Sequence, residues 1–131
     1  MTKVIHFCYG HRLLEHRGKC RHLHGHNGVL EITLLRKSLD RMGMVMDFDR
    51  IKSAVADWVK SRLDHKMLLN SRDPLVRVLR AQGEPVVALP GNPTAENIAR
   101  LVYTRARRRG LPVHSVRLWE SRDSSALYPA G

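Results

Sequence analysis

The stretch His24-Gly25-His26 opens the segment that places the strongest limits on how this chain can fold. Alternate side chains of a β-strand point to the same face, so a strand over residues 24–36 directs both imidazoles to one side. The apolar residues that share this face are Leu30, Ile32 and Leu34. The pattern therefore predicts a strand whose buried face begins with two histidines, with Gly25 leaving room for a close approach.

A third histidine is expected near this pair. Residues 3–9 also alternate like a strand, and His11 continues the inward positions of that strand. Zinc favours nitrogen and sulfur ligands, and three protein ligands with one open position are typical of a catalytic zinc. The sequence thus predicts a zinc site formed by His11, His24 and His26. The alternative is that His24 and His26 form only a polar pair at a sheet edge.

The chain contains two cysteines, Cys8 and Cys20. No export signal is recognisable at the N-terminus, and this favours free thiols over a disulfide. Cys8 lies within the first predicted strand and is expected to be a small buried hydrophobic residue. Cys20 lies in a segment rich in Lys, Arg and His, where positive charge stabilises a thiolate. Cys20 is therefore the cysteine expected to take part in chemistry.

The length and composition indicate one domain, residues 1–131, with a modest core. A hydrophobic content of 43% and a charged content of 27% are typical of a soluble globular protein. No apolar run approaches the length of a membrane span, and no signal peptide is apparent. A cytoplasmic location is therefore expected.

The formal charge of +11 indicates an anionic partner, which could be a nucleic acid, a membrane surface or a small substrate. Aromatic residues make up only 5% of the chain, and neither helix-turn-helix nor zinc-finger spacing is present. The one basic cluster, residues 105–109, is expected to be the solvated end of a helix. Composition therefore leaves the three kinds of partner open, and if the partner carries phosphate groups, Arg12 and Lys19 are candidate contacts.

The hydrophobic pattern predicts a strand at 45–48, helices at 50–62, 74–82 and 93–109, and strands at 85–89 and 113–121. Asp47 or Asp49 is expected to cap the first helix, and Asn92-Pro93 the last one. This order of elements predicts an α+β fold, with an antiparallel β-sheet and helices packed on one face.

Two acidic positions need an explanation beyond packing. Asp64 precedes His65 at the end of a predicted helix, where a turn would let the carboxylate fix the imidazole tautomer. A histidine that only caps the helix is the alternative. Glu120 falls on the apolar face of the last strand, where a carboxylate is costly unless it is paired. Its partner could be a bound ligand or a nearby arginine.

Several motifs occur together in a fixed order: Phe-Cys-Tyr-Gly-His-Arg-Leu ending at residue 13, Cys20, His24-Gly25-His26, Leu63-Asp64-His65, residues 92–97 (Asn-Pro-Thr-Ala-Glu-Asn) and Glu120. This set resembles the 6-pyruvoyltetrahydropterin synthase family. The three residues between Cys20 and His24 resemble its bacterial 6-carboxytetrahydropterin synthase branch, which belongs to the queuosine pathway. Arg21 departs from the glycine that is usual in the family.

The resemblance implies a role for each matching residue. It makes His11, His24 and His26 the zinc ligands, and Cys20, Asp64 and His65 the catalytic group. Glu120 would bind the pterin ring. The resemblance also implies a tunnelling fold (T-fold) and a homohexamer of two stacked trimers, with active sites between subunits.

The activity implied by the resemblance is that of a zinc-dependent lyase. It would convert 7,8-dihydroneopterin triphosphate to 6-carboxytetrahydropterin, acetaldehyde and triphosphate. One alternative is formation of 6-pyruvoyltetrahydropterin, or cleavage of another dihydropterin side chain. Another is a basic nucleic-acid-associated protein with a structural zinc, which would leave Cys20, Asp64, His65 and Glu120 without a role.

Overall fold

A six-stranded sheet with the strand order β4-β3-β1-β2-β5-β6 forms the centre of the computed structural model, which describes residues 1–130. The strands are β1 (Thr2–His11), β2 (His24–Leu34), β3 (Lys66–Asn70), β4 (Val86–Leu89), β5 (Val113–Trp119) and β6 (Ser125–Tyr128). Together with the helices this confirms the predicted α+β class. Gly131, the last residue of the predicted domain, lies outside the described residues.

The sheet is mixed, so the prediction of an antiparallel sheet is wrong at one edge. β1, β2, β5 and β6 pair antiparallel, whereas β3 runs parallel to both β1 and β4. Leu68 and Leu69 of β3 are both fully buried. A strand buried on both faces shows no alternation of polar and apolar residues, so the sequence pattern does not reveal β3 or its direction.

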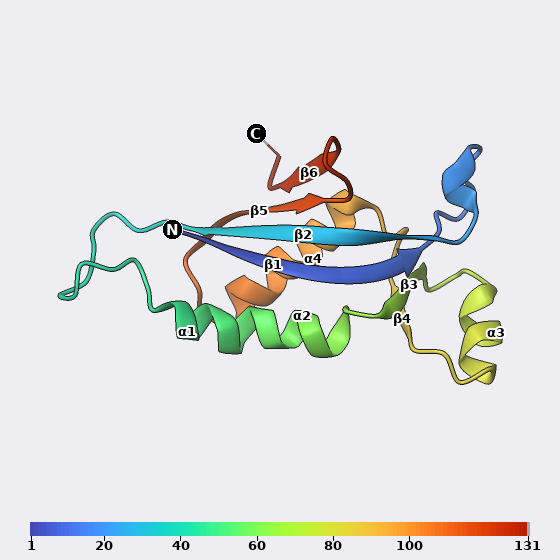
Figure 1. Ribbon diagram of the computed structural model, residues 1–131, viewed down its shortest axis with the longest axis horizontal. Coiled ribbons are helices and arrows are strands. Elements are labelled where there is room, and N and C mark those ends of the chain that lie inside the picture. Colours follow the sequence, from blue (N-terminus) through green and yellow to red (C-terminus); the bar gives the residue numbers. More distant parts are fainter. Residues whose placement is uncertain (131) are drawn as a thin grey trace.

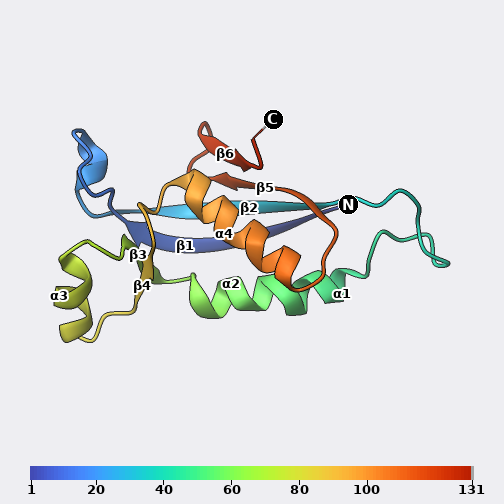
Figure 2. The same ribbon diagram turned by 180° about the vertical axis from the view of Figure 1, so that it is seen from behind.

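Two helical segments cover one face of the sheet, as Figures 1 and 2 show from opposite sides. One segment runs through α1 (Phe48–Ile51), a π-helical turn η2 (Lys52–Ala56) and α2 (Asp57–Arg62), and the other is α4 (Ala95–Arg108). The short helix α3 (Leu75–Ala81) lies at the end of the molecule near β3 and β4. The 3-10 turn η1 (Lys19–Arg21) lies at the same end (Figure 1).

The predicted inward positions of β1 and β2 are buried against these helices. On β1 they include Phe7, Tyr9 and His11, which are 4%, 3% and 2% exposed. They pack in one core with the leucine and isoleucine positions of β2 and the apolar faces of the helices. The face that carries the histidines is therefore also the face of the core, as the alternation predicts.

The helix starts agree only in part with the predictions. Asp47 caps α1, because its carboxylate accepts a hydrogen bond from the amide of Asp49 at 2.9 Å. The predicted strand at 45–48 is wrong, since Val45 and Met46 form a bend, Asp47 caps α1 and Phe48 is its first residue. α4 begins after Thr94, whose hydroxyl accepts from the Asn97 amide, and not at Asn92.

The basic cluster at the end of α4 is a solvated helix end, as predicted, with Arg107, Arg108 and Arg109 exposed. Within residues 1–130, the strands β3 and β6 and the 3-10 turn η1 were not predicted. Across residues 1–130, none of the helices has the length and apolar character needed to cross a membrane.

Candidate metal and substrate site

Three histidines from β1 and β2 converge at one end of the sheet. The antiparallel register pairs His11 with His24, and the next inward position of β2, His26, with Tyr9. Nε2 of His26 lies 3.2 Å from Nε2 of His11. One ring nitrogen from each histidine lies within 4.8 Å of the other two, so the three rings could hold one metal ion. The structure thus brings together the three residues that the sequence singles out.

Backbone carbonyls orient two of these rings. The Pro93 carbonyl lies 2.7 Å from Nδ1 of His11, and the His22 carbonyl lies 2.7 Å from Nδ1 of His24. A proton on each Nδ1 satisfies these carbonyls and leaves the Nε2 lone pairs free for a metal. Burial lowers the pKa of His11, which favours the neutral ring that metal binding requires.

Glycines allow the close approach of the two strands. A Cβ atom on Gly25 would lie 3.0 Å from the Tyr9 carbonyl oxygen, which confirms the expectation of a close approach there. A Cβ atom on Gly28 would lie 2.9 Å from the Phe7 ring and 3.0 Å from the Tyr9 ring. Gly28 therefore leaves space for two stacked rings whose centroids are 5.0 Å apart.

Asp64 and His65 lie in contact, as a turn after the helix would predict. Nδ1 of His65 is 3.0 Å from Oδ2 of Asp64. His65 has a φ of 58°, in the left-handed region, and this brings the two adjacent side chains to the same side. α2 is capped at Leu63, so the alternative of a capping histidine is not supported.

Two hydrogen bonds fix this turn to β1. The Cys8 amide donates to Oδ1 of Asp64 at 2.9 Å, and the His65 amide donates to the Cys8 carbonyl at 2.8 Å. Burial, the largest influence, favours neutral Asp64, but hydrogen bonds from Cys8 and His65 outweigh it. The pKa of Asp64 consequently lies below its usual value, and the ionised carboxylate can hold a proton on Nδ1 of His65.

His24, His26 and His65 open onto one cleft of about 790 Å³, whereas His11 and Asp64 lie behind them and do not line it. Its walls include Cys8, His24, His26, His65 and Met67. A substrate in this cleft could therefore contact the metal-type ligands and the imidazole of His65 together.

Glu120 follows directly after β5 and reaches towards His11. Its Oε1 atom lies 3.5 Å from the Tyr9 hydroxyl and 3.9 Å from Nε2 of His11. No arginine or lysine within residues 1–130 pairs with Glu120, so the predicted alternative of an arginine partner is not supported. Burial, followed by the charge of Glu120, raises the pKa of Tyr9, which keeps the phenol protonated and able to donate.

Glu120 also lines a second cleft of about 590 Å³, which shares residues 25–27 with the first. Tyr9 was not among the predicted site residues. Its position two residues before His11 on the same inward face is the signal that could have revealed it.

Cys20 lies in η1 and is half-buried. Its carbonyl accepts a hydrogen bond from the Leu13 amide at 2.8 Å. Both cysteines are free thiols, as predicted. Over the described part of the chain, however, the thiol of Cys20 belongs to neither group of metal-type donors. The part of Cys20 in the chemistry stays a prediction.

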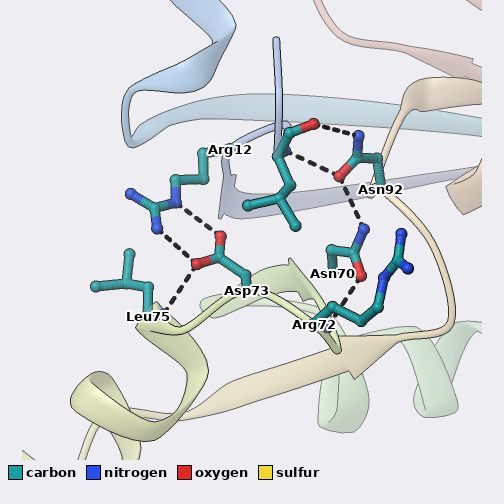
Figure 3. A network of polar contacts seen from close by, with 7 residues as sticks. Arg12, Asn70, Arg72, Asp73, Leu75 and Asn92 are labelled. Atoms are coloured by element: carbon teal, nitrogen blue, oxygen red, sulfur yellow. Dashed lines mark hydrogen bonds and ion pairs between the residues drawn. The ribbon is translucent and has the colours of Figure 1, made fainter.

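Side chains from distant segments hold the loop that leads to Cys20 (Figure 3). The Asn92 amide accepts from the Leu14 amide and donates to the Leu14 carbonyl, both at 2.9 Å. Asn70 donates to the same Asn92 oxygen at 3.1 Å. Arg12 donates two hydrogen bonds to Asp73, so its guanidinium already has an anionic partner and is less suited to the predicted phosphate contact. The sequence predicts Asn92 only as a helix cap, and it predicts none of these contacts to the loop.

The sequence model of the 6-pyruvoyl tetrahydropterin synthase family matches residues 1–130 of the chain. The 6-carboxy-5,6,7,8-tetrahydropterin synthase of Rickettsia bellii is 44% identical over 100 residues, which cover 75% of this chain and 72% of that protein. The Haemophilus influenzae protein of the same name is 32% identical over 136 residues, which cover 98% and 96% of the two chains.

Solved structures have the same fold. An uncharacterized protein from Wolinella succinogenes superposes with a TM-score of 0.80 at 28% identity and covers 97% of this chain and 95% of its own. The 6-pyruvoyl tetrahydropterin synthase of Caenorhabditis elegans gives a TM-score of 0.73 at 22% identity, with coverage of 100% and 94%. These two structures support the tunnelling fold that the sequence motifs imply.

Proposed function

Because the chain belongs to the 6-pyruvoyl tetrahydropterin synthase family, we propose that it is a zinc-dependent lyase acting on 7,8-dihydroneopterin triphosphate. The products would be 6-carboxy-5,6,7,8-tetrahydropterin, acetaldehyde and triphosphate. One observation carries this proposal. His24, His26 and His65 line one cleft, with His11 beside the first two and Asp64 in contact with His65, in a chain similar to proteins named 6-carboxy-5,6,7,8-tetrahydropterin synthase.

His11, His24 and His26 would hold the zinc ion. Two nitrogens bound to a tetrahedral zinc at about 2.0–2.1 Å are about 3.3 Å apart. The 3.2 Å between the Nε2 atoms of His11 and His26 fits this spacing, and the carbonyl partners of His11 and His24 favour the required tautomers. Bound zinc supplies Lewis acidity, which makes protons next to a substrate hydroxyl or carbonyl easier to remove.

His65 and Cys20 would move these protons. Asp64 holds Nδ1 of His65 and stabilises its charged form, which leaves Nε2 to exchange a proton with the substrate. The side chain of His65 is 78% exposed and stands at the cleft. Cys20 would act as the second proton-transfer group, with its loop held by Asn92 and by the Arg12–Asp73 pair.

Glu120 would bind the pterin ring. A pterin edge presents an N–H and an amino group side by side, which two carboxylate oxygens can accept together. Tyr9 supports the carboxylate from within the core through its hydroxyl. The basic character of the chain suits a triphosphate substrate.

The proposal also covers the assembly, the cellular location and the pathway of the enzyme. Residues 1–131 would form a single domain in a homohexamer of two stacked trimers, located in the cytoplasm and serving queuosine biosynthesis. The strands β4 and β6 each have only one neighbour in the described sheet, and an exposed edge is commonly paired in an assembly. Neither a membrane nor a nucleic acid is part of the proposed function.

Product analysis tests this proposal. Zinc-loaded protein is incubated with 7,8-dihydroneopterin triphosphate, and the products are identified by mass spectrometry. We expect 6-carboxytetrahydropterin and acetaldehyde in equal amounts. 6-Pyruvoyltetrahydropterin as the main product would assign the chain to the other activity of the family, and unchanged substrate would overturn the proposal. Light scattering at assay concentration should show an oligomer, and an active monomer would contradict the proposed assembly.

A further inference from the structure

Cys8 has no part in the proposed reaction, yet its thiol lies beside Asp64 and His65. One metal-type ligand atom from each of these three residues lies within 4.8 Å of the other two. Thiolate, carboxylate and imidazole are the ligand types that zinc takes in proteins. We propose that Cys8, Asp64 and His65 form a second zinc site of lower affinity, and that zinc bound there inhibits the enzyme.

Backbone hydrogen bonds hold these three residues together without a metal ion. The Cys8 amide binds Oδ1 of Asp64, and the Cys8 carbonyl accepts from the His65 amide, so β1 and the turn are held together on both sides of Cys8. The other Asp64 oxygen, Oδ2, lies 3.0 Å from Nδ1 of His65. A metal ion would therefore take the place of the proton between these two atoms, and this proton would move to Nε2 of His65 as the ring changes tautomer.

The charge and accessibility of the group also suit a divalent cation. Asp64 offers a carboxylate oxygen, and metal binding would convert the Cys8 thiol to a thiolate and release its proton to solvent. Two negative ligands would then neutralise the ion. Cys8 and His65 line the open cleft, so the ion can enter from solvent and keep water as a fourth ligand.

Zinc at this second site would bind both members of the Asp64–His65 pair, so neither could take part in proton transfer. Excess zinc should inhibit turnover while the three-histidine site stays occupied. This inhibitory effect depends on the proposed function, whereas metal binding by the three residues does not. The two parts can therefore be tested separately.

The binding test uses the fact that the chain has only two cysteines. In a Cys20→Ala variant, thiolate-to-cobalt charge-transfer absorption can come only from Cys8. We expect this absorption to develop with the second equivalent of Co²⁺, after the first equivalent has filled the histidine site. Absence of the charge-transfer band at saturating Co²⁺ would overturn the proposed site.

Two further variants control for folding. Cys8→Ser/Cys20→Ala should bind one equivalent of Co²⁺ and not two. Binding of that first equivalent at the histidine site would show that the variant is folded. Cys20→Ala/His65→Asn should lower the affinity for the second Co²⁺ by about tenfold or more, because an amide is a poorer metal ligand than an imidazole. A second equivalent that binds equally well to Cys8→Ser/Cys20→Ala would place the second metal elsewhere and contradict the site.

The inhibition test uses protein that carries one zinc per chain. Added Zn²⁺ should inhibit the wild type, and Cys8→Ser should raise the half-inhibitory concentration, measured against the variant's own rate without added zinc, by about tenfold or more. Equal inhibition of the two proteins would overturn the inhibitory role. If the one-zinc wild type showed no lyase activity, the proposed function would fail, and the cobalt titration would still decide whether the second site exists.

Discussion

The carbonyl of Pro93 lies 2.7 Å from Nδ1 of His11, so the segment that leads into α4 orients a candidate metal ligand on β1. The two residues are 82 positions apart in the chain. In the same segment Asn92 binds both backbone groups of Leu14, and Thr94 caps α4. The motif at residues 92–97 therefore joins three parts of the structure, and this accounts for its place among the family motifs.

Zinc affinity should distinguish a histidine of the metal site from a neighbouring histidine outside it. His24→Ala should lower zinc affinity by more than about 100-fold, because even the loss of an outer-shell partner costs 10–100-fold. His22→Ala is the matched control, because His22 contributes only its backbone carbonyl to the ring of His24. Zinc content after dialysis measures both variants. Equal zinc content in the two would contradict the three-histidine site.

Proton transfer should depend on Cys20 and His65. Cys20→Ala and His65→Ala should each lower kcat by about 10²–10⁴-fold, the usual contribution of a general acid or base. Both variants should retain the zinc of the histidine site, because neither residue lies within that ligand group. Steady-state kinetics and metal analysis on the same samples check this. Loss of that zinc in Cys20→Ala would instead make Cys20 a metal ligand and remove its proposed role.

Glu120 should be needed for pterin binding and not for zinc binding. Glu120→Ala should weaken pterin binding by about 10–100-fold, because hydrogen bonds to a charged group contribute about 1.5–3 kcal/mol. Fluorescence titration with a non-reactive pterin measures the affinity. Glu96→Ala is the control, since Glu96 lies in the first turn of α4, away from the cleft residues. Unchanged pterin affinity in Glu120→Ala would show that the ring binds elsewhere.

Gly28 should be essential for the position of Tyr9. In Gly28→Ala the new methyl group would lie 2.9–3.0 Å from the Phe7 and Tyr9 rings. Overpacking of this kind costs about 1–3 kcal/mol, and movement of Tyr9 would remove its contact with Glu120. Gly91→Ala, whose methyl group would lie 3.7 Å from its neighbour, should be close to neutral. Urea unfolding compares the two variants, and equal stability would show that the rings accommodate the methyl group.

The Arg12–Asp73 pair should make stability depend on pH. The hydrogen bond from Arg12 holds the pKa of Asp73 below its usual value of about 3.9. The unfolded chain therefore takes up this proton first as pH falls, so the contribution is complete above about pH 4–5 and is lost as pH falls through the folded pKa. Asp73→Asn should lower the unfolding free energy by about 1–3 kcal/mol near neutral pH.

Urea unfolding of the wild type and Asp73→Asn between about pH 3 and pH 7 tests this sign. The difference between the two proteins should be constant at the upper end of the range and shrink at the lower end. A difference that grows as pH falls would contradict the depressed pKa.

Alternation along the chain was sufficient to predict where the three histidines point. The inward face of β1 and β2 follows from a period of two residues. Tyr9 and His11 are buried on that face, and the half-buried His24 and His26 continue it at the end of β2. The start of the first helix at its Asp47 cap is local in the same sense. These features depend on neighbours in sequence, and a linear pattern contains that information.

Tertiary structure alone decided the partners of those residues. The parallel placement of β3, the Pro93 carbonyl on His11 and the Tyr9 contact with Glu120 join residues that are distant in the chain. Asn92 appeared from sequence to be a helix cap, but its side chain binds the loop after β1. A backbone carbonyl carries no residue-specific signal, and a side chain that can satisfy several partners takes the one that chain packing brings within reach.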